Sequence, residues 1–145
     1  MLDLDTVAWV PNQVAMERSA AEARSLVRSF CESCEHWVVE GCYTHLAKVA
    51  LDYWPVLLLL NPGLAQCIEN CQARPWEPHK YAAKTEQDAQ LGFLLIWVAD
   101  YYTRRGDLSF AEHRACFDSY SGPKHEITRQ PQLSPTSDEV LAWLA

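Results

Sequence analysis

One stretch of the chain, residues 91–102, is apolar at almost every position and reads LGFLLIWVADYY. A helix that is apolar around nearly its whole circumference is stable in water only when other elements cover it. Thr85 before this stretch is a candidate N-cap, and Gly106 after it is a candidate C-terminal glycine. The pattern therefore predicts a buried central helix over about residues 86–105.

The residues before this helix show amphipathic patterning. From about Asn12 to Glu40 the spacing alternates between four and three, which predicts one apolar helical face; the residues on it are Met16, Ala20, Ala23, Val27, Phe30, Cys34 and Trp37. Gly41 is expected to end or bend this helix. A second helix is predicted from about Tyr43, with a break at residues 52–54, because Pro55 lacks an amide donor and clashes with the preceding turn.

Turn and capping residues divide the rest of the chain. A short apolar helix is predicted over residues 56–60, and the next helix is expected to begin with Asn61 as N-cap and to reach about Ala73. A proline-containing loop over residues 74–81 then leads to the central helix. Ser109 and Glu112 have capping-box spacing, which predicts a helix over residues 110–120.

The sequence predicts a helical core domain at residues 1–122, followed by a C-terminal segment that docks on it. Residues 123–135 contain three prolines and are expected to form a linker or an extended strap. A short amphipathic helix is predicted over residues 136–145, and we expect it to dock on the core because it is too short to be stable alone. No strand pattern is predicted. The fold class is therefore all-α, a compact single-domain bundle of about six helices around the buried central helix.

Composition narrows the classes of partner. The 145 residues are enough for one domain with its own core. With 19 acidic and 12 basic residues the net charge is −7 at pH 7, which disfavours direct binding to nucleic acid or to anionic membranes. A protein partner with a basic surface fits this charge better. The sequence carries no indication of the oligomeric state.

The amino terminus and the length of the apolar runs indicate a cytoplasmic protein. The first residues, MLDLD, have neither the basic segment nor the long apolar segment of a secretory signal. The apolar runs at residues 53–60 and 91–99 are shorter than the roughly 20 residues that cross a bilayer. In that compartment the six cysteines are expected to be reduced thiols.

The cysteines offer one possible metal or redox site. In a single straight helix Cys31 and Cys42 would lie about 16 Å apart, at roughly 1.5 Å per residue, which is too far to share an ion. A thiolate cluster for zinc or copper would instead combine pairs from two neighbouring helices, namely Cys31, Cys34, Cys67 and Cys71. The favoured interpretation is simpler: the cysteines are small buried apolar residues, and the chain carries no cofactor or metal.

A catalytic site is a third, less favoured possibility. One of the thiols could pair with His36, His45, His79 or His113 as a base. The polar interruption at Asp100 could also mark a site, although a satisfied buried carboxylate is the favoured interpretation. The sequence contains no serine-hydrolase elbow, zinc-protease or nucleotide-binding motif. We therefore assign no catalytic residue and lean against an enzyme.

The loop before the central helix is the best candidate for a binding surface. It combines the residue types that most often anchor protein interfaces with a backbone stiffened by prolines; the candidate partner-binding residues are Arg74, Trp76, His79, Lys80 and Tyr81. Trp76 could equally fold inward as a plug. The sequence as a whole predicts a small acidic cytoplasmic protein-binding regulator, of the inhibitor, immunity or anti-defence type, that covers a basic partner surface. The alternatives are the thiol-based metal or redox sensor and the small enzyme.

Overall fold

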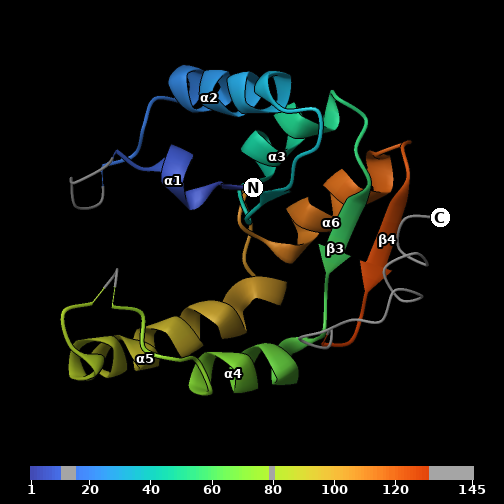
Figure 1. Ribbon diagram of the computed structural model, residues 1–145. Helices are drawn as coiled ribbons and strands as arrows, with labels where there is room; N and C mark the ends of the chain where they lie inside the picture. Colours follow the sequence, from blue (N-terminus) through green and yellow to red (C-terminus); the bar gives the residue numbers. More distant parts are fainter. Residues whose placement is uncertain (11–15, 79–80, 131–145) are drawn as a thin grey trace.

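A computed structural model describes residues 1–10, 16–78 and 81–130 of the chain (Figure 1). In these residues the fold is mostly helical, with four short strands. The helices are α1 (Asp5–Ala8), α2 (Ala20–Ser33), α3 (Thr44–Leu51), α4 (Leu64–Gln72), α5 (Lys84–Ala99), the 3-10 helix η1 (Asp100–Tyr102) and α6 (Phe110–Ser119). The strands are β1 (Leu2–Asp3), β2 (Val39–Glu40), β3 (Leu57–Leu60) and β4 (Lys124–Ile127).

The main hydrophobic core lies in the N-terminal half, between α1, α2 and α3 (Figure 1). The predicted amphipathic stripe is confirmed in part: Ala23 and Val27 of α2 are buried, whereas Met16, Ala20 and Cys34 are exposed. Ser19 accepts a hydrogen bond from the Glu22 amide as N-cap. The helix is shorter than predicted, because it covers residues 20–33 and the chain beyond it is extended. Leu46 of α3 completes the core and is fully buried.

The prediction that Gly41 ends or bends the first helix is wrong, because α2 ends at Ser33. Gly41 instead lies where the chain turns between β2 and α3. Its φ angle is +141°, and a Cβ added there would lie 2.7 Å from Cβ of Leu4. Leu4 is itself 1% exposed, so it has no room to move away. The glycine allows β2 to pair in parallel with β1, which places the N-terminus against the core.

The predicted helix over residues 56–60 is wrong. These residues form β3, which pairs in parallel with β4 in a register that joins Leu57 to Lys124 and Leu60 to Ile127. The turn after α3 explains the difference, because Trp54 has a φ of 62° and Pro55 follows it, so the chain leaves the turn extended. Part of the predicted strap, residues 124–127, is therefore a strand.

The β3–β4 sheet packs on α6 through its polar side chains. Lys124 Nζ donates to the carbonyl oxygens of Phe117 and Tyr120 at the C-terminal end of α6, at 2.7 and 2.6 Å. A cation is favourable there because the helix dipole leaves those carbonyls partly negative. Glu126 forms an ion pair with Arg114 of α6. These contacts fix β4 to the rest of the fold.

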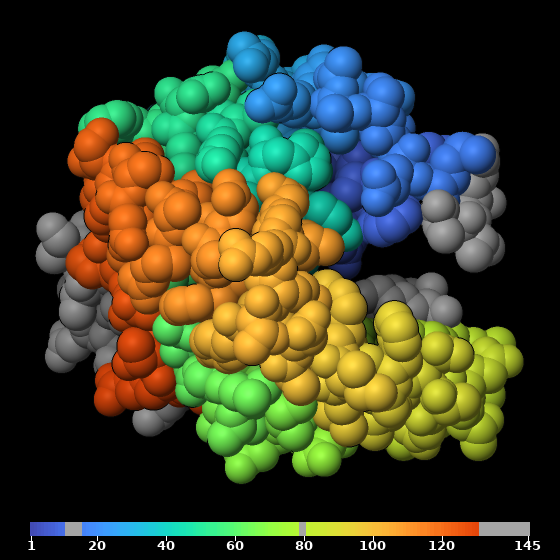
Figure 2. Space-filling model, turned by 180° about the vertical axis from the view of Figure 1, so that it is seen from behind, coloured from blue at the N-terminus to red at the C-terminus, as the bar shows by residue number. Residues whose placement is uncertain are grey.

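The prediction of a buried central helix is not confirmed. Helix α5 is present, but it packs beside α4 as an arm that projects from the fold (Figures 1 and 2). All of its residues are described, and Gln87 is the one that is buried. The helix begins at Lys84 with Ala83 as N-cap, two residues before the predicted N-cap Thr85. The six helices therefore do not form a bundle around α5.

Two other predicted caps have different outcomes. The capping box at α6 is confirmed, since the Ser109 hydroxyl accepts from the Glu112 amide at 3.2 Å. The N-cap of α4 is Gly63, with a φ of 91°, and not Asn61. Asn61 has another role: its amide donates to Glu126 at 2.7 Å, and its carbonyl accepts from the Tyr102 hydroxyl at 2.7 Å. It thus connects the sheet to the end of the α5 arm.

The remaining predictions for the end of the chain fall on residues 131–145, which lie outside the described residues. They concern the end of the strap and the helix predicted over residues 136–145. In the part of the chain that the structure describes, no helix combines the length and the apolar content needed to cross a bilayer.

Candidate functional site

The loop between α4 and α5 contains the predicted partner-binding residues, of which His79 and Lys80 lie outside the described residues. The other three lie on the arm. Arg74 forms an ion pair with Glu77, and the Tyr81 amide donates to the Glu77 carbonyl at 3.0 Å. The Trp76 indole N–H donates to the Tyr81 carbonyl at 3.3 Å. The loop thus closes on itself through its own polar groups.

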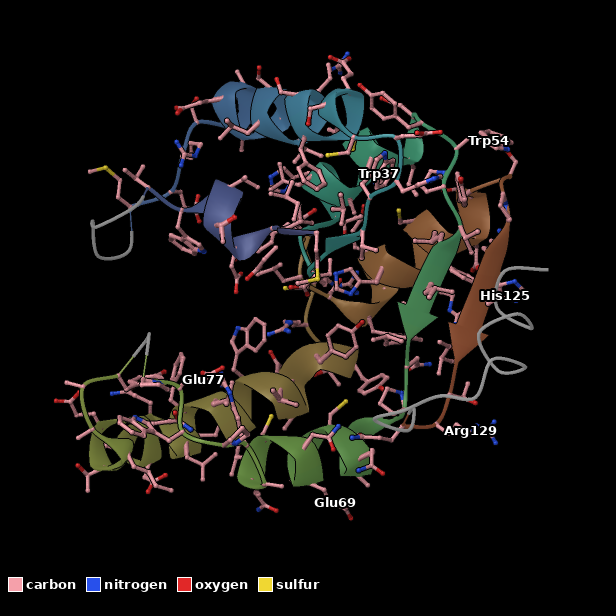
Figure 3. The ribbon with its side chains drawn as sticks, viewed as in Figure 1. Trp37, Trp54, Glu69, Glu77, His125 and Arg129 are labelled. Carbon is pink, nitrogen blue, oxygen red and sulfur yellow. The ribbon has the colours of Figure 1, made fainter. Side chains whose placement is uncertain are left out.

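Gln87 of α5 attaches this loop to the arm. Its side-chain oxygen accepts from the Glu77 amide at 2.8 Å, and its side-chain nitrogen donates to the Pro75 carbonyl at 3.0 Å. Gln87 is buried, and both bonds are partly shielded from water. This amide, with both ends satisfied, holds the backbone at Pro75 and Glu77 against α5 (Figure 3 shows Glu77 beside α5).

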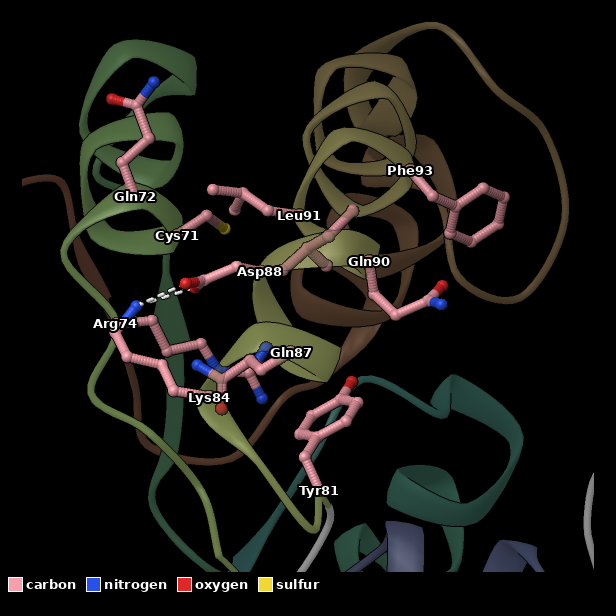
Figure 4. A pocket seen from close by; sticks show the side chains of 11 residues that line it. Cys71, Gln72, Arg74, Tyr81, Lys84, Gln87, Asp88, Gln90, Leu91 and Phe93 are labelled. Atoms are coloured by element: carbon pink, nitrogen blue, oxygen red, sulfur yellow. Dashed lines mark hydrogen bonds and ion pairs between the residues drawn. The ribbon is translucent and has the colours of Figure 1, made fainter.

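A shallow pocket of about 340 Å³ lies where the loop meets α4 and α5 (Figure 4). Arg74 and Tyr81 line it, together with Cys71 of α4. The Lys84 ammonium and the Asp88 carboxylate form an ion pair at 2.7 Å across its wall. The pocket therefore offers polar groups whose charges already balance, which suits a complementary polar surface better than a free ion.

Trp76 does not fold inward as a plug, since 44% of its surface remains exposed. Its ring is held by a hydrogen bond to the same loop and projects from the arm. An exposed tryptophan on a fixed backbone is the arrangement expected of an anchor at a protein interface.

The four-cysteine cluster is not assembled. Cys31 lies in the N-terminal core on α2, whereas Cys67 and Cys71 lie on α4, at the opposite end of the molecule (Figure 1). Cys34 is exposed just after α2. Burial raises the pKa of the Cys31 thiol and of the Cys67 thiol. Within residues 1–10, 16–78 and 81–130, no three His, Cys, Asp or Glu side chains converge as a metal site would require.

Two histidines meet at the junction of α3, α6 and the end of α5. His45 Nδ1 lies 2.7 Å from Asp107 Oδ2, and the His45 amide donates to the other oxygen of that carboxylate at 2.9 Å. His113 Nε2 lies 2.7 Å from the Cys42 carbonyl, and its Nδ1 lies 2.7 Å from the Tyr101 hydroxyl. The hydrogen bonds of both imidazoles therefore connect segments that lie far apart in the sequence.

The Cys42 thiol, three residues before His45, is not activated. Burial, followed by the nearby Asp5 carboxylate, raises the pKa of the Cys42 thiol above its usual range. A nucleophilic cysteine needs the opposite, a pKa lowered by a positive neighbour. The Asp107–His45 pair orients an imidazole at a structural junction. His36 is exposed beyond α2.

The expectation of a buried Asp100 is wrong. Asp100 is exposed at the end of α5, where its carboxylate accepts from the Thr103 hydroxyl at 2.6 Å. The Arg104 side chain stacks on Trp97 nearby, 3.7 Å from the ring centroid. The polar groups at this end of the helix form their hydrogen bonds and ring contacts with neighbouring residues, and Asp100 is a local cap.

Sequence reasoning missed two features of the arm. Gln87 was not singled out, although a glutamine between acidic residues and an apolar run is a candidate for holding a neighbouring loop. The exposed side chains of Phe93 and Ile96 were expected to be core.

No protein-family model, no curated protein and no solved structure matches this chain.

Proposed function

We propose that this chain is a small cytoplasmic protein-binding regulator that covers a basic surface of another protein, with the loop at residues 74–81 as its recognition element. The single observation that carries the proposal is the attachment of this loop to the buried Gln87 while Trp76 stays 44% exposed. Function of this kind requires no bound cofactor.

The hydrogen bonds of the described loop residues, 74–78 and 81, support binding over a purely structural role. Association is weakened by the entropy of ordering side chains and loops at the interface. In this loop the Arg74–Glu77 ion pair, the Tyr81 amide and Gln87 already fix the backbone. Trp76 can therefore enter a pocket on a partner with little further ordering.

The charge of the chain supports a basic partner. At a net charge of −7, long-range attraction accelerates encounter with a positive surface and weakens as salt screens it. Inhibitors and immunity or anti-defence proteins that block a nucleic-acid enzyme act on such surfaces. This class is our leading candidate for the biological role.

The experiment is affinity capture at low salt from cells that produce the protein, followed by calorimetry with the purified partner. Trp76→Ala should weaken binding about tenfold or more, as loss of an interface anchor does. Trp54→Asn is the matched control, because Trp54 is 61% exposed and lies at the other end of the molecule from Glu77 (Figure 3). Asparagine tolerates the positive φ at that position.

Two results would overturn the proposal. One is the absence of any stoichiometric partner whose binding face is basic. The other is equal binding by the two tryptophan variants, which would place the contact away from the loop. Raising the salt concentration should weaken the complex in proportion to the charges that it pairs.

A further inference from the structure

A second pocket lies away from the arm, where helices α3 and α6 end (Figure 1). Its volume is about 460 Å³, which is within the range of sites that bind small molecules. Residues between 48 and 54, at the end of α3, and between 116 and 121, at the end of α6, form its walls. All of them belong to the part of the chain that the structure describes.

Two aromatic side chains line this pocket. The ring centroids of Trp54 and Tyr120 lie 5.7 Å apart, and the planes of the rings are tilted by 59°. Trp54 is 61% exposed, whereas Tyr120 is buried. The Tyr120 hydroxyl donates to the Pro55 carbonyl, which fixes the position of its ring. The face of an aromatic ring carries partial negative charge and attracts a cation.

Trp54 has an unfavourable backbone conformation. Its φ is 62°, and within residues 1–10, 16–78 and 81–130 it is the one residue other than glycine with a positive φ. A bulky side chain is disfavoured in this region, and residues strained in this way cluster at ligand-binding sites. Glycine or asparagine would form the same turn with less strain. The turn therefore does not explain the tryptophan, but a function of its ring would.

The charges that line the pocket leave one carboxylate without a partner. Asp52 is exposed, and among the described residues no ion pair or hydrogen bond reaches its carboxylate. It is also the C-cap of α3, where the helix dipole adds partial negative charge. Lys48 lines the pocket too, but its ammonium is paired with Glu112 at 2.8 Å. Lys124 is likewise occupied, because it donates to three carbonyl oxygens at the end of α6.

We propose that this pocket binds a small molecule with a quaternary ammonium group, of the choline type. Trp54 and Tyr120 supply the aromatic faces, and Asp52 supplies the opposite charge. Asp52 is the one carboxylate that lines the pocket. A guanidinium or a primary ammonium carries several N–H donors, most of which would face the rings without an acceptor. A quaternary ammonium has no such donor, so it loses least when it enters.

The pocket is independent of the proposed function. Figure 3 shows Trp54 far from Glu77 of the recognition loop, and the two sites share no residue. Trp54→Asn should therefore remove binding of the small cation and leave binding of the protein partner unchanged, whereas Trp76→Ala should do the reverse. Each tryptophan variant is thus the control for the other site, and the two proposals fail separately.

The first test is a titration of the full chain with choline chloride, followed by NMR. The indole N–H signal of Trp54, identified by its absence in Trp54→Asn, should shift in a saturable way with a Kd of about 1 mM or lower. Sodium chloride at the same concentrations should not reproduce the shift. A Trp54 signal that stays unchanged at tens of millimolar choline overturns the proposal.

The choice of ligand tests the class of compound. In the neutral carbon analogue of choline a tert-butyl group replaces the trimethylammonium group, so the shape is kept and the charge is lost. This analogue should bind at least about tenfold more weakly than choline. Equal binding of the two compounds overturns the proposal. Tighter binding of ethylguanidine, or of a peptide that contains trimethyllysine, also overturns it, because the ligand would then belong to another class.

Variants of the two key residues test the site itself through the choline methyl signal in saturation-transfer NMR. Trp54→Asn should raise the Kd for choline at least about tenfold, and Asp52→Asn, which keeps the shape and removes the charge, about fivefold. Trp54→Tyr should restore most of the affinity, because it returns a ring to the same backbone. Trp76→Ala should leave the Kd unchanged. A Kd that is the same in both pocket variants, with circular dichroism showing a folded chain, overturns the proposal, as does an equal loss in Trp76→Ala.

Discussion

The N-terminal half and the α4–α5 arm are both rich in apolar residues, but the first buries these side chains and the second leaves several of them exposed. In the N-terminal half, α2 is amphipathic, and its buried face, which includes Val27, packs with Leu46 of α3 in the core. In the arm, α5 is apolar on nearly every side, yet Phe93 and Ile96 remain exposed. The difference shows that the burial of a helix depends on how its apolar residues are distributed around the axis, and not on how many it has.

The largest effect is expected when one apolar side chain is removed, because the resulting loss in the free energy of unfolding should differ between the two regions. Leu46→Ala should lower the free energy of unfolding by about 2–5 kcal/mol, because Leu46 is 0% exposed and its removal leaves a cavity. The same change at Leu64 of the arm should cost less than about 1 kcal/mol. Urea denaturation of both variants measures the contrast. Equal losses would mean that the arm contributes to the core as strongly as α3 does.

The glycine that closes the N-terminal half gives the next largest effect. Gly41→Ala should lower the free energy of unfolding by about 1–3 kcal/mol, because its φ of +141° and the nearby Leu4 side chain leave no place for a methyl group. Thermal unfolding measures the loss. An unchanged Tm would show that the backbone at this turn adjusts to the methyl group, and would contradict the description of this half as rigid.

A smaller effect is expected at the base of the recognition loop. Gln87→Ala should lower the free energy of unfolding by about 1–2 kcal/mol, since it removes two hydrogen bonds to the loop backbone. Hydrogen exchange should accelerate at the Glu77 amide, which loses its acceptor, while the N-terminal core stays protected. If exchange accelerates equally in α2, the arm and the core unfold as one unit and the two regions are not distinct.

The smallest effect concerns Glu126, at the junction between the sheet and the arm. Hydrogen bonds from Asn61 and then from Arg114 hold the pKa of its carboxyl below the usual range. A lowered folded pKa contributes stability that is present above the unfolded value near ~4.3 and is lost as pH falls through the folded value. Glu126→Gln should therefore reduce stability at pH 7 by less than about 1 kcal/mol.

Denaturant titrations of the wild type and Glu126→Gln at pH 7 and in the acid range measure this contribution. The difference between the two proteins should shrink as pH falls, because the wild-type carboxylate becomes protonated. A difference that is the same at both pH values would show that the glutamate acts through packing and not through its charge.

Local signals in the sequence predicted those elements that depend on neighbouring residues. The buried part of the α2 stripe, the capping box at Ser109 and the break before Pro55 all follow from such signals. Strand β3 could not be predicted, because a run of four leucines has no alternation and its partner β4 lies far along the chain. The hydrogen bonds that replace the predicted cap at Asn61 are equally long-range.

The candidate site divides in the same way. Its loop could be predicted from Pro75, Pro78 and the aromatic residues around them, and the structure places Arg74, Trp76 and Tyr81 on it. The anchoring by Gln87 and the exposure of α5 could not, because both depend on how two helices pack. The separation of the cysteine pairs depends on the packing of α2 and α4, which the spacing of the thiols does not encode.

The parallel pairing of β3 with β4 also determines the order of folding. During synthesis the leucine strand emerges well before its partner, because α4, α5 and α6 lie between them. Closing so long a loop is slow, and until then an unpaired apolar strand presents free backbone groups to other nascent chains. We therefore expect β3 to be the segment through which this protein aggregates when its synthesis is truncated, and the one that a chaperone shields first.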